Sequence, residues 1–471
     1  MIMHNYANLR GLLLPEIEIS YLIGSFIIGF ADPMIECKER KHEKNRQTFF
    51  PRKAVPLQKR SFNMKIIDGG VTAAKGFLAS GGAAGIKKNG SDDMAIIYAE
   101  VPCVSAGTFT TNRVKAAPVI WDRELVKGGS PIQAVIVNSG VANACTGEEG
   151  LRYCRETAAA ASKELNIPES AVCVASTGVI GVQIPIDKIR TGIGKIAPSL
   201  GKGREDALKA AKAIMTTDTV SKEACVELTF SDGSKAVIGG CCKGSGMIHP
   251  NMCTMLCFLT TDAKISKEML QKALSGVIPD TFNMVSVDGD TSTNDTCLLL
   301  TSGLADNAPI EADGEDYEVF RAGLLEVCTS LAKQMARDGE GATCLFEVKI
   351  VGADTKENAK ILARSVVSST LTKAAIAGHD ANWGRILCAM GYSGVDFDPD
   401  KVDLFFESAA GKIRIMKDGV GTDYSEETAT KILSEDAILA TADLKSGDAE
   451  AYAWGCDLTH EYVNINADYR S

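Results

Sequence analysis

The chain has 471 residues, which is enough for two or three structural units around a large core. Hydrophobic residues at 45%, charged residues at 23% and 44 glycines are typical of an α/β enzyme with many tight turns, and they exclude a fibrous or intrinsically disordered chain. A formal charge of -10 disfavours nucleic acid and anionic membranes as partners, because both attract basic surfaces, so we expect small-molecule substrates.

The amino-terminal segment, residues 1–63, differs from the rest of the chain. Residues 19–31 form an apolar run that is too short to cross a bilayer and lacks the flanks of a secretory signal. Residues 37–60 are strongly basic without periodicity, and Met64 opens a segment typical of a natural start. We interpret residues 1–63 as a leader or an upstream-start extension outside the fold, so a chain truncated to begin at Met64 should still fold.

Hydrophobic periodicity predicts an alternation of strands and helices in the first half of the chain. Asp232 and Gly233 mark a hairpin turn, because this pair favours tight two-residue turns. In chain order, the predicted elements are short strands around a turn within 94–120, a strand at 133–138, a helix at 148–165, a strand at 171–175, a helix at 205–215 and a hairpin at 224–240.

The second half continues the same alternation. We predict a strand at 255–260, a helix at 266–277, a strand at 284–287 and a long helix at 315–337. After Thr343 the pattern becomes a strand, a helix, a loop at 378–385, a hairpin at 402–416, a helix at 425–434 and further strands. We therefore divide the folded part into a main domain, residues 64–345, and a smaller carboxy-terminal domain, residues 346–471.

Three loops at predicted strand ends carry hydrogen-bond donors: residues 176–178, 216–217 and 243–246. Acyl transfer needs such donors, because negative charge builds up on the carbonyl oxygen and must meet groups already aimed at it. Glycines in two of these loops allow the backbone to come close to a ligand. The alternative is that the loops are ordinary turns, and glycine content leaves this open.

The segment from Lys243 to Leu256 places a hydroxyl residue, Thr254, just after a glycine-rich turn. An unassisted threonine hydroxyl is a poor nucleophile, because no group on the side chain takes its proton. If the bond between Cys253 and Thr254 is cut, an α-amine with a pKa of about 8 is freed within reach of the hydroxyl of the same residue. One residue then supplies both the nucleophile and the base.

Nine motifs occur in the order seen in one enzyme family and together span residues 69–471. They are GGVTAAKGF, GTFTTNRVKAAPV, NSGVANACTG, STGVIG, KGSGMIHPNMCTML, DTSTND, ARDGEGATCL, ANWGR and YVNINADYRS. On these motifs the chain resembles the ornithine acetyltransferase family of arginine biosynthesis. The resemblance implies a precursor that cuts itself before a threonine and then moves an acetyl group from N-acetylornithine to glutamate through an acetyl-threonine intermediate.

The resemblance also implies a fold and an assembly. The implied fold is a layered α/β/β/α-type sandwich similar to self-cleaving aminopeptidases, with a smaller carboxy-terminal α/β domain whose last residues return to the active site. The implied assembly is a cytoplasmic heterotetramer of two amino-terminal and two carboxy-terminal fragments. We expect no cofactor and no metal, and acetyl-CoA is left open as a second acetyl donor that would make the enzyme bifunctional.

Site residues are carried over motif by motif. Thr254 resembles the family's nucleophile, and the cut falls between Cys253 and Thr254. Thr177 and Gly178 resemble the oxyanion hole, the first through its hydroxyl and the second through its N–H. Lys243 suits a carboxylate and Glu340 an ammonium, although the sequence does not tell which end of a substrate each one holds. The family's substrate-binding positions match Thr217, Lys243, Thr254, Glu340, Asn466 and Ser471.

Two positions depart from the family's pattern. Cys253 replaces the usual alanine, which places a thiol beside the cut and leaves open that Cys253 is itself the processing nucleophile, with cleavage after Met252. Ser471 replaces a terminal threonine but keeps a hydroxyl and the chain-terminal carboxylate, so we expect little loss of function.

Other polar residues invite roles that we do not assign. His249 lies shortly before Thr254, but an amino-terminal amine makes a histidine base unnecessary, so we expect a loop residue. We interpret residues 379–385 as structural or subunit contacts. The aspartates of residues 288–295 lack the glycine and bidentate glutamate positions of a calcium loop. The 15 cysteines lack the spacing of a disulfide framework or a zinc site, which favours reduced thiols.

Two rival functions are kept. The same nucleophile and oxyanion hole could pass an acyl group to water, as in an amino-terminal-nucleophile aminopeptidase or amidase, and the identity of the acceptor separates the two. An uncleaved regulatory binding protein would instead remain a single chain of 50.0 kDa.

Overall fold

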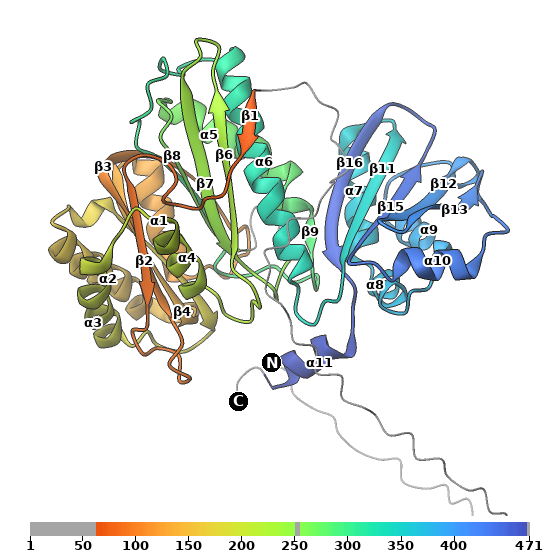
Figure 1. The fold of residues 1–471 in the computed structure, drawn as a ribbon. Helices are drawn as coiled ribbons and strands as arrows, with labels where there is room; N and C mark the ends of the chain where they lie inside the picture. The colour runs from red at the N-terminus through yellow and green to blue at the C-terminus, as the bar shows by residue number, and fades with distance from the viewer. Residues whose placement is uncertain (1–62, 250–254, 469–471) are drawn as a thin grey trace, which may run out of the picture. The chain divides into compact units, whose positions relative to one another are not determined.

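The protein is described by a computed structural model that covers residues 63–249 and 255–468 (Figure 1). All of these residues belong to one structural unit. The predictions made for residues 1–62, for Cys253 and Thr254, and for Ser471 lie outside the described residues.

A nine-stranded mixed sheet has the strand order β1-β6-β7-β8-β10-β3-β4-β5, with β2 added against β3. The pairs β8–β10 and β4–β5 are parallel, and the other pairs are antiparallel. The bounds are β1 Met64–Ile66, β2 Phe77–Gly82, β3 Met94–Phe109, β4 Ile132–Val141, β5 Val172–Val179, β6 Lys222–Thr229, β7 Lys235–Lys243, β8 Leu256–Thr261 and β10 Thr296–Thr301.

Strand β3 belongs to both halves of this sheet, one formed by β2, β4 and β5 and the other by β1, β6, β7, β8 and β10. Its first residues, from Met94 to Tyr98, pair with β4, its last residues, from Val104 to Phe109, pair with β10, and the register shifts between Tyr98 and Cys103. The prediction of short strands around a turn was wrong here. Extra residues in a bulge bend a strand without ending its pairing, so one continuous strand makes the corner.

The two halves of the sheet face each other across a shared core. Ile97 and Val135 from one half pack in the same buried cluster as Phe258 and Leu298 from the other. Successive side chains of a strand point to opposite faces, so the residues next to these core residues point away from the shared core. One outer face packs against α2 and α3, and the other against α5 and α6. The layers are therefore α/β/β/α, and the expected fold class is confirmed.

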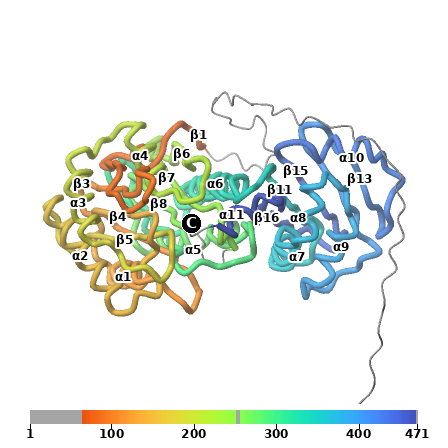
Figure 2. Tube along the Cα trace, turned by 90° about the horizontal axis from the view of Figure 1, so that it is seen from below, coloured from red at the N-terminus to blue at the C-terminus, as the bar shows by residue number. Residues whose placement is uncertain are grey.

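Helices α2 and α3 lie side by side at one flank of the sheet, as Figures 1 and 2 show. Helices α1 and α3 were not predicted. The β-branched residues Val119 and Ile120 favoured a strand, but Pro118 fits the first turn of a helix, where its missing N–H is not needed. The bounds are α1 Ala117–Gly128, α2 Gly147–Leu165, α3 Ile186–Ile196, α4 Arg204–Ala213, α5 Lys267–Val277 and α6 Glu315–Arg337.

A second sheet of seven strands has the order β14-β13-β12-β15-β11-β16-β9. Its strands are β9 Val285–Ser286, β11 Leu345–Ala353, β12 Asp403–Ser408, β13 Gly411–Lys417, β14 Val420–Gly421, β15 Ala437–Asp443 and β16 Ala449–Cys456. The accompanying helices are α7 Lys356–Ser368, α8 Thr370–Ala377, α9 Trp383–Gly391, α10 Glu426–Leu433 and α11 His460–Ala467. The domain boundary after residue 345 stays a prediction, and β9, which precedes it in the chain, pairs with β16.

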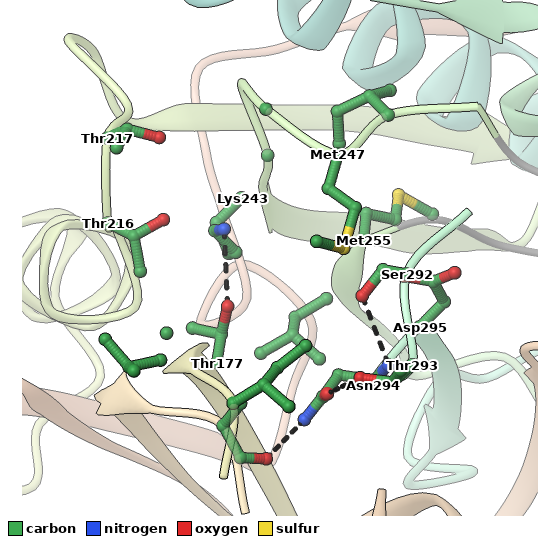
Figure 3. A pocket seen from close by; sticks show the side chains of 18 of the residues that line it. Thr177, Thr216, Thr217, Lys243, Met247, Met255, Ser292, Thr293, Asn294 and Asp295 are labelled. Carbon is green, nitrogen blue, oxygen red and sulfur yellow. Dashed lines mark hydrogen bonds between the residues drawn. The ribbon is translucent and has the colours of Figure 1, made fainter. Parts of the chain in front are cut away.

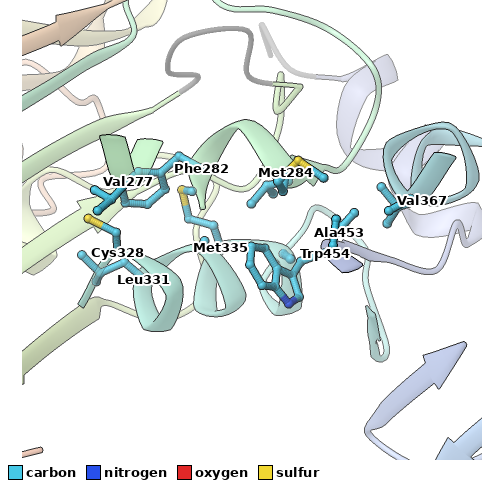
Figure 4. Close-up of a cluster of buried hydrophobic side chains, with 14 of the residues drawn as sticks. Val277, Phe282, Met284, Cys328, Leu331, Met335, Val367, Ala453 and Trp454 are labelled. Atoms are coloured by element: carbon cyan, nitrogen blue, oxygen red, sulfur yellow. The ribbon is translucent and has the colours of Figure 1, made fainter. Parts of the chain in front are cut away.

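Helix α6 packs against both sheets. Gly323 lets it approach β6, because a Cβ at this position would lie 2.3 Å from Cδ2 of Leu228. Farther along the helix, Met335 shares a buried cluster with Trp454 of β16 and with Met284 (Figure 4). One continuous apolar core therefore runs from the first sheet through α6 to the second.

The described cysteines are all free, and all of them except Cys145 and Cys388 are buried. Among the helices of residues 63–249 and 255–468, none combines the length and the apolar character needed to cross a membrane.

Leu331→Ala should lower the free energy of unfolding by about 2–5 kcal/mol, because the side chain is fully buried in the core around α6 and its removal leaves a cavity. Leu371→Ala is the matched control, since Leu371 is 62% exposed and its loss should change stability by less than about 0.5 kcal/mol. Urea unfolding followed by circular dichroism measures both. Equally small effects would contradict the role given to α6.

Candidate active site

A cavity of about 320 Å³ lies where β5 and β7 end and where β8 and β10 begin (Figure 3). The order of the strands brings the end of β7 and the starts of β8 and β10 to one edge of the sheet. The lining residues are Ala142, Thr177, Gly178, Val179, Ile180, Thr216, Thr217, Lys243, Gly244, Gly246, Met247, Ile248, Met255, Leu256, Ser292, Thr293, Asn294, Asp295, Glu340 and Asn466.

The fold brings together the described residues that the family resemblance singled out. They come from segments far apart in the sequence, and Met255, the residue after Thr254 in the chain, lines the cavity with them. Cys253, Thr254 and Ser471 lie outside the described residues. The roles of all these residues stay predictions. The candidates that line the cavity are Thr177, Gly178, Thr217, Lys243, Glu340 and Asn466.

Gly178 stands near the end of β5 in a backbone conformation that favours glycine. Its φ is 125°, and a Cβ there would lie 2.3 Å from the carbonyl carbon of Gly140 on β4. The neighbouring Thr177 also lines the cavity. This close contact between two strands therefore fixes the position of a backbone N–H next to a hydroxyl, as an oxyanion hole requires.

Asn294 supports this strand end and was missed by sequence reasoning. Its Nδ2 donates to the carbonyl of Ser176 at 2.8 Å and to the carbonyl of Ala142, and its Oδ1 accepts a hydrogen bond from Thr293 at 2.6 Å. The available signal was the motif DTSTND, but its polar residues were considered as a group. The amide therefore joins the loop before β10 to β5.

Lys243 ends β7 and is buried at the cavity wall. Its Nζ lies 3.4 Å from Oγ1 of Thr177 and 3.9 Å from Oδ2 of Asp218. The ammonium thus stands between the threonine of the candidate oxyanion hole and a buried carboxylate. An anion bound in the cavity would meet it close to the Thr177 hydroxyl.

Glu340 follows α6 and brings a carboxylate to the cavity. Its N–H donates to the carbonyl of Ser245 at 2.9 Å, and its Oε2 accepts a hydrogen bond from Nδ2 of Asn466 at 2.8 Å. A Cβ on Gly246 would lie 2.3 Å from this carboxylate, so a larger residue there would displace the Glu340 carboxylate from its present position. Lys243 and Glu340 therefore bring an ammonium and a carboxylate to the cavity, and together they complement a zwitterionic amino acid.

The aspartates of residues 288–295 have different surroundings. Asp288 accepts hydrogen bonds from the N–H groups of Met247 and Ile248 at 2.6 and 2.9 Å, and so fixes the turn after β7. Asp295 lines the cavity, and burial raises the pKa of its carboxyl well above the usual value. Within the described part of the chain, no cluster of three or more His, Cys, Asp or Glu residues has the arrangement of a metal site.

His249 is tied to neighbouring loops. Its Nδ1 lies 3.0 Å from Oγ of Ser286, and its carbonyl accepts a hydrogen bond from Thr291 at 2.8 Å. Burial, together with the charge of Arg364, lowers the pKa of the imidazole to about 4, so it is neutral near pH 7. It is not among the described residues that line the cavity.

Comparison with known proteins places this architecture in a family. The ArgJ family model matches residues 78–471. The chain is 50% identical over 398 residues to the arginine biosynthesis bifunctional protein ArgJ of Thermotoga neapolitana, covering 84% of this chain and 99% of that protein. It is also 50% identical over 401 residues to arginine biosynthesis bifunctional protein ArgJ 1 of Clostridium acetobutylicum, covering 85% and 97%.

A crystal structure of arginine biosynthesis bifunctional protein ArgJ from Bacillus halodurans matches with 45% identity and a TM-score of 0.43, over 45% of this chain and 97% of that one. The family match and the two sequence relatives extend over most of the chain. The chain therefore belongs to the ArgJ family, and the resemblance drawn from its nine motifs is confirmed.

Proposed function

We propose that this protein is a self-processing glutamate N-acetyltransferase of arginine biosynthesis that moves the acetyl group of N-acetylornithine to glutamate. Its relatives in arginine biosynthesis, 50% identical over most of the chain, support acetyl transfer. The observation that carries the proposal is the cavity at Met255, where Thr177 and Gly178 lie with a cation, Lys243, and a carboxylate, Glu340.

The first step is self-cleavage. The Thr254 hydroxyl attacks the carbonyl carbon of Cys253, the peptide C–N bond breaks, and the nitrogen of Thr254 takes a proton to become an amine. Water then hydrolyses the resulting ester, which frees the carboxylate of Cys253 and restores the hydroxyl. One water molecule is consumed, and Thr254 becomes a chain terminus.

Acetyl transfer then follows in two steps. The Thr254 hydroxyl attacks the acetyl carbonyl of N-acetylornithine while the α-amine of the same residue takes its proton. The C–N bond breaks, the proton passes to the leaving amine, and ornithine departs from an acetyl ester on Thr254. The α-amine of glutamate attacks this ester, the bond between the acetyl carbon and the Thr254 oxygen breaks, and a proton from the attacking amine returns to that oxygen. N-acetylglutamate leaves, and the Thr254 hydroxyl is restored. In each step the hydroxyl of Thr177 and the N–H of Gly178 face the negative charge on the acetyl oxygen.

The substrates suit the charges of the cavity. Ornithine and glutamate both carry an α-carboxylate, which complements Lys243, and ornithine carries a side-chain ammonium, which complements Glu340. Both protein groups are largely buried, so their charges act through a medium that screens less than water does. The pair therefore selects amino-acid substrates over simple acetyl esters.

Several finer features belong to the same proposal. Acetyl-CoA would be a second donor, as the word bifunctional in the relatives' names suggests. No cofactor takes part, the two fragments assemble as a heterotetramer of two copies each, and the enzyme works in the cytoplasm. Transfer to water by an aminopeptidase or amidase is not favoured, since the relatives over most of the chain are arginine-biosynthesis proteins.

Thr254→Ala should abolish both cleavage and transfer, because alanine has no nucleophile. On a denaturing gel with intact-mass analysis, wild type should give two fragments that meet between residues 253 and 254, and the variant one chain of 50.0 kDa. Thr191→Ala, at an exposed threonine of α3, is the control and should be cut like wild type. An uncut wild type that still forms N-acetylglutamate would sink the proposal.

The acceptor is tested on enzyme that carries a labelled acetyl group on Thr254. Glutamate should release this label far faster than water does.

Thr177→Ala should lower kcat by a factor of about 10² to 10³, the usual cost of removing one oxyanion-hole donor, and should change KM much less. Thr177→Ser keeps the hydroxyl and is the matched control, expected to retain most of the activity. Steady-state kinetics with N-acetylornithine and glutamate measure both. Full activity in Thr177→Ala would remove Thr177 from the oxyanion hole.

A further inference from the structure

A buried ion cluster lies next to the cavity without lining it. Nζ of Lys222 is 2.7 Å from Oδ1 of Asp218 and 2.6 Å from Oδ2 of Asp338, and the side chain of Lys222 is 0% exposed. Burying three charges in this way carries a large desolvation penalty, and removing one member leaves an uncompensated charge. The cluster therefore calls for an explanation beyond general stability.

Each carboxylate of the cluster also holds the backbone of a segment that lines the cavity. Asp218 accepts the N–H of Gly244 at 2.7 Å and the N–H of Thr216 at 2.9 Å. Asp338 accepts the N–H of Thr219 at 3.1 Å and lies two residues before Glu340. Lys222 thus bridges Asp218 and Asp338, and through them it links the segments that carry Thr217, Lys243 and Glu340.

The cluster also controls the charge around Lys243. Oδ2 of Asp218 lies 3.9 Å from the Lys243 ammonium, which is itself 3.4 Å from the Thr177 hydroxyl. Burial acts to raise the pKa of Asp218, but the charges of Lys222 and Lys243 outweigh it and hold that pKa below its usual value. Burial likewise acts to lower the pKa of Lys222, and Asp218 and Asp338 raise it above the usual value. Asp218 and Lys222 are therefore both ionised at neutral pH.

We infer that Lys222 is a positioning residue for acetyl transfer, which occupies Asp218 and Asp338 and so keeps the Lys243 ammonium available to the carboxylate of the substrate. Without Lys222, the buried carboxylate of Asp218 would lose its closer cation and draw the Lys243 ammonium, 3.9 Å away, from Thr177. The inference rests on the proposed function, because it names what orients the substrate-binding cation of that site.

Lys222→Met tests this role. KM for both N-acetylornithine and glutamate should rise at least about tenfold, the scale on which residues that orient ligand-contacting groups usually act. Kinetics are measured on protein that intact mass shows to be in two fragments. Binding of L-ornithine, measured by isothermal titration calorimetry, gives a readout that does not need turnover and should weaken by a similar factor.

A double variant separates positioning from lost packing. Lys222→Met combined with Asp218→Asn removes the cation together with the carboxylate that lies 3.9 Å from Lys243, so the group that would draw the Lys243 ammonium away is gone. KM should then return most of the way to its wild-type value, and so should the affinity for ornithine. A merely structural role predicts equal recovery when Asp338→Asn takes the place of Asp218→Asn, since removal of either carboxylate restores the net charge of the cluster. Positioning predicts little recovery with Asp338→Asn, because Asp218 still lies beside Lys243 without Lys222. A folded Lys222→Met, Asp218→Asn variant whose KM stays at least about tenfold above the wild-type value overturns the inference, and this comparison needs no folded Lys222→Met.

Lys445→Met is the matched control. Lys445 also joins two aspartates, Asp403 at 2.7 Å and Asp418 at 2.6 Å, but it does so in the second sheet. This variant should leave KM unchanged, and an equal rise in KM here would overturn the inference, as would a wild-type KM in Lys222→Met. Wild-type transfer is assayed in parallel, so a failure of the proposed function appears in the wild type, whereas a failure of the role of Lys222 appears only in the variants.

Discussion

The packing of α6 is the constraint on which the rest of the structure depends. This helix is buried along most of its length, against β6 and β7 with one part of its surface and against β9 and β16 with another. Close-packed interiors deform little, so the end of the helix cannot shift without repacking both sheets. Asp338 and Glu340 follow that end directly. An apolar core therefore sets how far a carboxylate stands from the cation at the end of β7.

The polar part of the site shows the same logic at shorter range. The oxyanion-hole candidates are fixed by backbone contacts, through the approach of Gly178 to Gly140 and through the amide of Asn294. The charged candidates are held by different contacts: the buried carboxylate of Asp218 lies 3.9 Å from the Lys243 ammonium, and Gly246 packs closely against the Glu340 carboxylate. Donors that are already in place need no reorganisation when charge develops on a substrate, and this is the main source of electrostatic catalysis.

Much of this molecule could be predicted from its sequence, for reasons that differ between elements. The long helix at 315–337 and the hairpin turning at Asp232 and Gly233 follow from local periodicity and turn chemistry, and the structure places both as expected. The bent strand β3 and the helix α1 could not be predicted in this way. Their conformations depend on partners distant in the sequence, such as the pairing of β3 with both β4 and β10.

The residues of the site also fall into those that the sequence indicates and those that only the structure shows. Motifs pointed to Thr177, Lys243 and Glu340 because these residues stand in recognisable loops. The motif DTSTND contains Asn294 but does not single it out as a support, and no motif points to Lys222 as a buried cation. Lys222 opens a strand and reads in the sequence as an ordinary exposed charge. Only the three-dimensional approach of Asp218 and Asp338 shows that it is enclosed.

The order of strands in the first sheet affects how the protein assembles and how it is inactivated by unfolding. β8 and β10 lie between β7 and β3, so strands that follow the proposed cut are flanked on both sides by strands that precede it. The uncut chain folds in a unimolecular reaction, whereas two separated pieces would have to find each other in solution, at a rate set by their concentration. Because the strands pair before the proposed cut, the two fragments are already assembled when they form. Once separated, they would reassociate only slowly. The lifetime of the active enzyme would then depend on the rate at which the cut protein unfolds rather than on its equilibrium free energy of unfolding.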